Sequence, residues 1–322
     1  MLDLARLKRV KLSAKPRGQV LMANMVLLPN FRMPRSTEIA LEGLENLPGG
    51  PVMFAMNHTD RYNYWPFQFK MYKGGHGFAA TWVKGKYYEN GFVGWFMDHC
   101  NNIPLPSRGY VISTEFRAKT GRVPSRDEYR LLRDIVNGSC AVGGPYPDDT
   151  SRDLQGFLAT GDFDREFELL FNQMMTEVVR LCRLAHQELG QHLLVFPQGT
   201  RSKRLTRGHT GLVQMAQHLG ATIVPVGCNG SDLVYPGNSP FAKGGKIVYR
   251  IGAPITVDAP AISAARVPED ALPFSRGAAA YSEQYQSITD VVMDRINDLL
   301  DPEYQRQVGV EAESEAVSRF IE

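Results

Sequence analysis

The sequence has few cysteines and almost no net charge, and each shortage excludes a class of protein. Its 322 residues include only 4 cysteines. They are well separated and form no CxxC pair, so neither a zinc cluster nor a disulfide framework is expected, and reduced thiols in the cytoplasm are the simplest interpretation. The formal net charge of +2 argues against a nucleic-acid-binding polyelectrolyte.

Long apolar runs are also missing. A spanning helix needs about 18 apolar residues, whereas the longest candidate, residues 20–28, is short and interrupted by Asn24. The preceding residues are rich in lysine and arginine and lack the apolar core of a secretory signal. The chain is therefore expected to remain in the cytoplasm without crossing a membrane.

What the sequence does have is apolar material in an alternating order. Hydrophobic residues make up 43% of the chain, enough for a substantial core. Apolar spacing predicts a long helix over 164–189 and a shorter one over 212–219. Short apolar runs of the kind that form strands occur at 51–56, 192–196, 222–226 and 246–251. Strands separated by helices predict an α/β fold, with a mixed, largely parallel sheet sandwiched by helices.

Charge and composition divide the chain into segments. Residues 1–46 form a basic, amphipathic helical segment, 47–257 the α/β core, and 258–322 a helical segment with an acidic tail. The basic N-terminal residues, followed by the apolar stretch 20–28, either lie on an anionic membrane surface or form a solvated helix packed on the core. Both interpretations stay open at this point.

Residues 109–163 are rich in glycine and proline and show one helix-like patch, at 126–136. This segment is predicted to be an excursion from the sheet, of the kind that forms a lid, because long loops inside compact domains are usually functional.

Three motifs occur in a fixed order. Asn-His-Thr-Asp-Arg-Tyr-Asn (57–63) and Phe-Pro-Gln-Gly-Thr-Arg-Ser (196–202) each follow a predicted strand, and Ile-Val-Pro-Val occupies 223–226. This combination resembles the lysophospholipid acyltransferase family, which includes the 1-acylglycerol-3-phosphate acyltransferases. The resemblance extends from about residue 42 to 257 and includes Ala-Thr-Trp-Val-Lys at 80–84.

The resemblance implies an enzyme of phospholipid biosynthesis, bound peripherally to a membrane. It would move a fatty acyl group from acyl-CoA or acyl carrier protein, as co-substrate, to the hydroxyl of a lysophospholipid-like acceptor, with no metal or other cofactor. On physical grounds, His58 at the end of a strand can act as general base on that hydroxyl. A thioester already has a good leaving group, so one base, an oriented acceptor and donors for the oxyanion suffice.

Two positions depart from the family pattern. Asn63 stands where the family has Asp, and Gln198 where it has Glu. An amide at 63 can still fix the tautomer of His58, but it cannot stabilise the imidazolium by charge. Asp60 is the nearest carboxylate that could compensate, but a cap of the following helix is the favoured interpretation of Asp60, and Asn63 could itself be a cap.

The second motif suits an anion. Gly199 and Thr200 form a turn that could offer backbone N–H groups, and Arg201 can fork two phosphate oxygens. The family resemblance places the acceptor phosphate here, with Arg201 and Gln198, and Arg108 is a second phosphate candidate. Two other functions remain open, which are a catalytically silent lipid- or acyl-binding homologue and an acyltransferase with a non-phosphate acceptor.

Overall fold

The computed structural model describes residues 1–141, 150–159, 161–256, 258–263, 265, 267–268 and 271–307. Its centre is a 7-stranded sheet in the order β1-β7-β6-β2-β5-β3-β4. The strands are β1 (Thr37–Glu42), β2 (Met53–Met56), β3 (Ala79–Lys84), β4 (Ile103–Leu105), β5 (His192–Val195), β6 (Ile223–Asn229) and β7 (Gly245–Ile251). Neighbours are parallel except β6 and β7. The predicted mixed, largely parallel sheet is confirmed.

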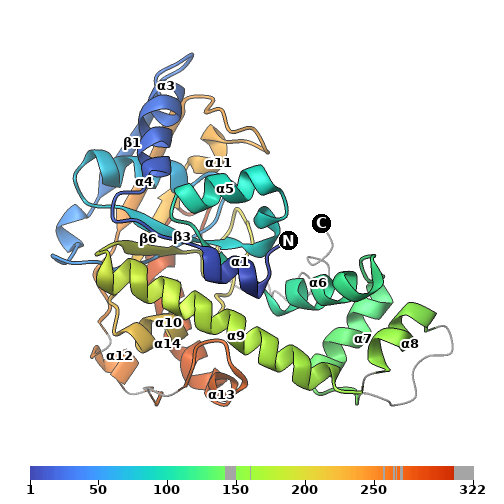
Figure 1. Cartoon of the computed structure of the whole chain (residues 1–322). Coiled ribbons are helices and arrows are strands. Elements are labelled where there is room, and N and C mark those ends of the chain that lie inside the picture. The colour runs from blue at the N-terminus through green and yellow to red at the C-terminus, as the bar shows by residue number, and fades with distance from the viewer. Residues whose placement is uncertain are drawn as a thin grey trace.

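Helices cover both faces of the sheet (Figure 1). Successive residues of a strand point to opposite faces, and in β2 Met53 joins one core cluster while Phe54 joins the other. Helices α9 (Phe163–Arg183), α10 (Gly211–Leu219) and α14 (Ser282–Asp298) cover the Met53 face. Helices α4 (Tyr64–Lys73) and α11 (Ser231–Val234) cover the Phe54 face. All four residues of β2 are buried, which explains its continuous apolar sequence.

The strongly apolar elements lie where the sequence predicts them. The expected strands correspond to β2, β5, β6 and β7, and the long expected helix corresponds to α9 and the π-helical turn Leu184–Glu188 that follows it. Three strands were not predicted. The edge strand β4 has 3 residues and contains Pro104, β1 is only partly buried, and β3 ends in charged Lys84.

The N-terminal segment wraps around the core. Helix α1 (Leu4–Arg9) packs on α9 and buries Leu7. Helix α2 (Arg17–Leu21), the π-helical turn Met22–Leu27 and α3 (Leu28–Asn30) form a nearly continuous helical segment packed near α4. Within the described ranges, no helix combines the length and apolarity that a membrane crossing requires.

The excursion is helical where the structure describes it. Helices α6 (Arg108–Thr120), α7 (Arg126–Val136) and α8 (Arg152–Leu158) pack on one another and, through α6 and α7, on α9 at the end that projects beyond the sheet (Figure 1). The expectation of a single helix-like patch was therefore wrong, because the apolar faces of α6 and α8 form one core with α7. Residues 142–149 of the excursion lie outside the described residues.

The remaining helices are short. Helix α5 (Gly91–His99) follows a 3-10 turn (Gly85–Tyr88), another 3-10 turn covers Leu44–Asn46, and α12 (Pro260–Ser263) and α13 (Arg276–Ala279) precede α14. The end of the expected acidic tail, residues 308–322, lies outside the described residues.

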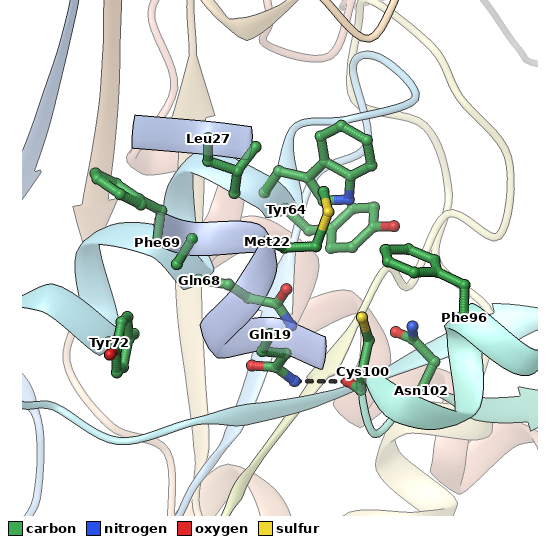
Figure 2. Close-up of a pocket in the computed structure, with 12 residues that line it drawn as sticks. Gln19, Met22, Leu27, Tyr64, Gln68, Phe69, Tyr72, Phe96, Cys100 and Asn102 are labelled. Atoms are coloured by element: carbon green, nitrogen blue, oxygen red, sulfur yellow. Dashed lines mark hydrogen bonds between the residues drawn. The ribbon is translucent and has the colours of Figure 1, made fainter. Parts of the chain in front are cut away.

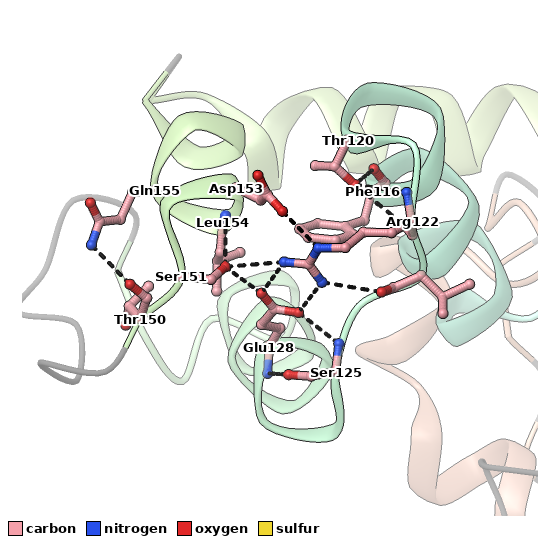
Figure 3. Close-up of polar contacts among 11 residues, drawn as sticks. Phe116, Thr120, Arg122, Ser125, Glu128, Thr150, Ser151, Asp153, Leu154 and Gln155 are labelled. Carbon is pink, nitrogen blue, oxygen red and sulfur yellow. Dashed lines mark hydrogen bonds and ion pairs between the residues drawn. The ribbon is translucent and has the colours of Figure 1, made fainter.

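A polar network joins the three helices of the excursion (Figure 3). The guanidinium of Arg122 donates to both carboxylate oxygens of Glu128, at 2.7 and 2.8 Å, and to Asp153 at 2.7 Å. Glu128 also forms a capping box with Ser125 at the start of α7 and accepts from the Ser151 hydroxyl. The hydrogen bonds from Arg122 are the main reason that the pKa of Glu128 falls to about 2.

This network predicts an acid-sensitive excursion. The folded-state pKa of Glu128 lies below its ordinary value of 4.5. Its contribution to stability is therefore present above pH 4.5 and lost as the pH falls toward 2. Replacing Glu128 by Gln should lower the melting temperature by a few degrees at pH 7 and by less near pH 3. An equal loss at both pH values, measured by circular dichroism with Asp127→Asn as the control, would contradict the assignment.

Candidate active site

The first two motifs meet at the carboxyl ends of neighbouring strands of the sheet. Strands β2, β5 and β3 are parallel neighbours, so their carboxyl ends lie together, which is where α/β sheets commonly bind ligands. Asn57 and His58 follow β2, Phe196 to Gln198 follow β5, and Lys84 ends β3. The backbone N–H of Ser202 donates to the carbonyl of His58 at 2.8 Å, joining the first motif to the second.

His58 is half-buried and held from two sides. Its Nδ1 lies 3.1 Å from Oδ1 of Asn63. Its ring stacks on Phe196, with centroids 4.1 Å apart and an interplanar angle of 19°. Within the described part of the chain, no group forms a hydrogen bond to Nε2. That nitrogen is therefore available to a substrate.

The orientation of the Asn63 amide fixes the tautomer of His58. Nδ2 of Asn63 donates to the carbonyl of Asn57 at 2.8 Å, so Oδ1 must face the imidazole. Since an amide oxygen only accepts hydrogen bonds, Nδ1 of His58 carries the proton and Nε2 has the free lone pair. Asn63 is fully buried, and its carbonyl accepts from the Tyr249 hydroxyl at 2.5 Å. Although Asn63 occupies the cap position of α4, its side chain does not cap that helix.

Asp60 does not contact the imidazole. Its carboxylate accepts from the backbone N–H of Tyr62 at 2.8 Å and from the Thr59 hydroxyl at 3.0 Å. These are local contacts that close the turn before α4. Burial is the main reason that the pKa of Asp60 is raised above its ordinary value. In this geometry Asp60 is a turn residue, and Asn63 alone orients His58.

Gln198 connects the two motifs through both ends of its amide. Its Oε1 accepts from the backbone N–H of His58 at 3.0 Å, and its Nε2 donates to the Thr206 hydroxyl at 3.2 Å. The side chain is 2% exposed. It is thus placed behind His58, where it holds the backbone, and it does not face the substrate side.

The turn at 199–202 uses part of its backbone internally. The N–H of Gly199 donates to the carbonyl of Phe196 at 3.0 Å, so neither it nor the bonded N–H of Ser202 is available to an anion. Gly199 has φ +65°, and a Cβ there would lie 2.8 Å from the His209 ring, so glycine is required. Thr200 lies between Gly199 and Arg201 in the same turn. Anion binding at this turn therefore depends on the Arg201 side chain.

Arg201 is exposed, and no carboxylate among the described residues pairs with it. Lys84, which the motif analysis had not assigned a role, lies in the same electrostatic environment. Burial lowers the pKa of His58 to about 4, the hydrogen bond that its Nδ1 donates to Asn63 opposes this shift, and Arg201 and Lys84 add to it. The signal for Lys84 was its place as a charged residue at the end of a buried strand.

Arg108 contacts α7 and α9. Its guanidinium forms an ion pair with Glu168 and donates to the carbonyl of Val136 at 3.4 Å. It also lies over the rings of Phe167 and Phe171, at 5.1 and 5.2 Å from their centroids. Helix α9 thus supplies a counter-ion for Arg108, and the role of Arg108 as a phosphate ligand stays a prediction.

The aromatic residues after the first motif line a small cavity between the N-terminal helices, α4 and α5 (Figure 2). Tyr64, Phe69 and Phe96 contribute to its wall. Its volume of about 30 Å³ is close to that of a single water molecule. These aromatics are partly buried against the core, and the cavity is too small for a fatty acyl chain.

A protein-family comparison supports the resemblance inferred from the motifs. The Acyltransferase family model matches residues 163–229, which include the second and third motifs. The chain carries an acyltransferase segment. The prediction of an acyltransferase is confirmed at this level.

Comparisons with curated sequences and with solved structures add no further support for a function. A search of curated protein sequences finds no match. Among solved structures, the chain is similar to the 1-acyl-sn-glycerophosphate (LPA) acyltransferase PlsC from Thermotoga maritima, with 14% identity and a TM-score of 0.38, over 90% of this chain and 79% of that one. A likeness this low carries no argument.

Within the described residues, no group of His, Cys, Asp and Glu gathers as a metal site.

The electrostatics of the candidate site predict an unusual pH profile for any reaction that uses His58 as base. If His58 acts as base, it must be neutral, and its pKa of about 4 in the free protein places the acidic limb of kcat/KM near pH 4. Because Lys84 and Arg201 disfavour the imidazolium, Lys84→Gln should move that limb toward the ordinary histidine value of 6.5. An acidic limb near pH 6.5 in the wild type would contradict the lowered pKa of His58.

Proposed function

We propose that the protein transfers an acyl group from a thioester to the hydroxyl of a phosphate-bearing lysolipid. The observation that carries this proposal is His58, whose free Nε2 is fixed in orientation by Asn63 beside two cations, Lys84 and Arg201. The acyltransferase family match supports the same chemistry.

The reaction needs only this base and a thioester. Nε2 of His58 takes the proton of the acceptor hydroxyl as its oxygen forms a bond to the thioester carbonyl carbon. The positive field of Lys84 and Arg201 favours the negative charge that develops on the carbonyl oxygen. The C–S bond then breaks with its electron pair on sulfur, and the imidazolium returns the proton to the thiolate. An ester and a free thiol result.

The acceptor is proposed to present its phosphate to Arg201. A guanidinium binds two phosphate oxygens at once, and Arg201 has no carboxylate partner among the described residues. A silent lipid-binding homologue is the alternative that the neutral residues Asn63 and Gln198 would favour. A free, correctly oriented Nε2 favours a working enzyme.

A membrane surface is the proposed location of the acceptor. Leu21 and Met25 on the N-terminal helical segment are 60% and 70% exposed, and Phe92 and Trp95 on α5 are 74% and 53% exposed. Helix α2 packs against α5. Exposed aliphatic and aromatic side chains, next to the basic N-terminal residues, are typical of a surface that inserts shallowly among anionic lipids.

Replacing His58 by Ala should remove nearly all turnover, by a factor of about 10² to 10⁴, while the protein remains folded. The assay follows thiol release from acyl-CoA and acyl carrier protein over a panel of lysolipids, with circular dichroism to verify the fold. Arg126→Gln on α7 serves as a distant control. Unchanged thiol release by folded His58→Ala would exclude the proposed base.

Replacing Asn63 by Asp separates a slowed enzyme from a silent homologue. A carboxylate would raise the pKa of His58 and stabilise the imidazolium, which should increase kcat by up to about 10⁴. It would also lose the donation to the carbonyl of Asn57, so the variant should melt at a lower temperature. Asp60→Asn should leave kcat within a few-fold of the wild type. Loss of turnover in Asp60→Asn would show that Asp60 acts on His58.

A further inference from the structure

The candidate site has a cation that one acceptor phosphate does not account for. Arg201 and Lys84 suffice for a single phosphate group, and both influence His58. Arg61, in the loop between β2 and α4, lies three positions after the base. No Asp or Glu of the described ranges pairs with it, and its guanidinium forms no hydrogen bond there.

Arg61 is held by aromatic rings. Its guanidinium carbon lies 5.9 Å from the ring centroid of Tyr62 and 5.7 Å from that of Tyr87. Both distances fall within the range of cation–π contacts. Tyr87 belongs to the 3-10 turn that directly follows β3 and Lys84. Arg61 therefore extends from the end of β2 toward the end of β3, across the end of the intervening strand β5.

This placement adds a second arginine near the ends of the strands that carry the motifs. The loop after β5 supplies Arg201, to which Lys84 is coupled electrostatically, and the loop after β2 supplies Arg61, which contacts Tyr87. A partly buried guanidinium that packs only on rings retains its N–H donors for a ligand. An acyl transfer brings two substrates to one imidazole, so a second cationic group corresponds to a second anionic substrate.

We propose that Arg61 binds the phosphates of a nucleotide-bearing thioester donor, that is, the 3′-phosphoadenosine diphosphate part of an acyl-CoA. The proposal rests on the proposed acyl transfer and specifies its donor. The nucleotide part carries several phosphate charges, whereas the pantetheine arm that reaches the thioester carries none. A flat guanidinium that Tyr62 and Tyr87 hold through ring contacts alone keeps its donors for the two phosphates of a diphosphate.

The test compares donors that share the thioester and differ in the nucleotide. Acyl-CoA and the same acyl group on pantetheine are assayed by thiol release, with wild type, Arg61→Gln, Arg61→Lys and the distant control Arg126→Gln. The KM for acyl-CoA should rise about ten- to hundredfold in Arg61→Gln, and the KM for acyl-pantetheine should not change. Arg61→Lys should recover part of the loss. Arg201→Gln should instead raise the KM for the lysolipid.

Binding is measured separately from turnover. Adenosine 3′,5′-bisphosphate and CoA should bind wild type and Arg126→Gln equally, by calorimetry, and Arg61→Gln about ten- to hundredfold more weakly. Equal binding of these ligands to wild type and Arg61→Gln would overturn the proposal. So would an effect of Arg61→Gln confined to acyl carrier protein, which would indicate an acidic protein as donor. Absence of thiol release from every donor would overturn the acyl transfer itself, while the binding measurement still decides the role of Arg61.

Discussion

The side-chain amide of Asn63 donates to the carbonyl of Asn57 and accepts from the imidazole of His58, and the remaining site geometry depends on this contact. Asn57 in turn exchanges two hydrogen bonds with the backbone of Cys228, at 2.7 and 3.0 Å. The end of β2 is thereby fixed to the end of β6, and His58 is placed by the sheet rather than by its loop. Because Asn63 is fully buried, loss of either partner would leave a polar group unpaired, at a cost of about 1–3 kcal/mol.

Neutral amides and nearby cations act together at this site. Burial is the main cause that disfavours a charged imidazole at His58, and Arg201 and Lys84 add to it, while the hydrogen bond that Nδ1 donates to Asn63 opposes it. The base is thus weak but always in its neutral form near pH 7. A weaker base transfers protons with less driving force, whereas the cations that weaken it are the ones that favour the anionic substrate and oxyanion. The arrangement trades basicity for electrostatic stabilisation of the reacting groups.

The sequence predicted the elements whose residues are buried on both faces or arranged with a clear helical period. Strand β2 and helix α9 are of this kind. It did not predict β4, which is a short edge strand containing Pro104. The site residues within the motifs, His58, Asn63 and Arg201, do come together. The ion pair of Arg108 could not be predicted from sequence, because its partner Glu168 lies far along the chain on α9.

Lys84 and Arg61 illustrate a different limit. Neither lies at a motif position to which sequence reasoning assigned a role, and each acquires its place only when β3 is paired next to β5 in the sheet. The excursion shows the same effect in its packing. The capping box of Ser125 and Glu128 is local, so the sequence alone can predict it. The hydrogen bond from Ser151 to Glu128 forms only because the start of α8 packs beside α7, which the sequence does not predict.

Gln198 explains how the site tolerates a second neutral substitution. Its Oε1 accepts from the backbone N–H of His58, and its Nε2 donates to the Thr206 hydroxyl, so the amide connects the loop of His58 to that of Thr206. A carboxylate at this position has no hydrogen to donate. A glutamate there would place a negative charge in a nearly closed environment, behind the base rather than facing the substrate. Both Asn63 and Gln198 therefore use their extra donor to position His58. In the proposed reaction the position of the base is thereby fixed, and the positive charge of the site stays available to the two proposed anionic substrates.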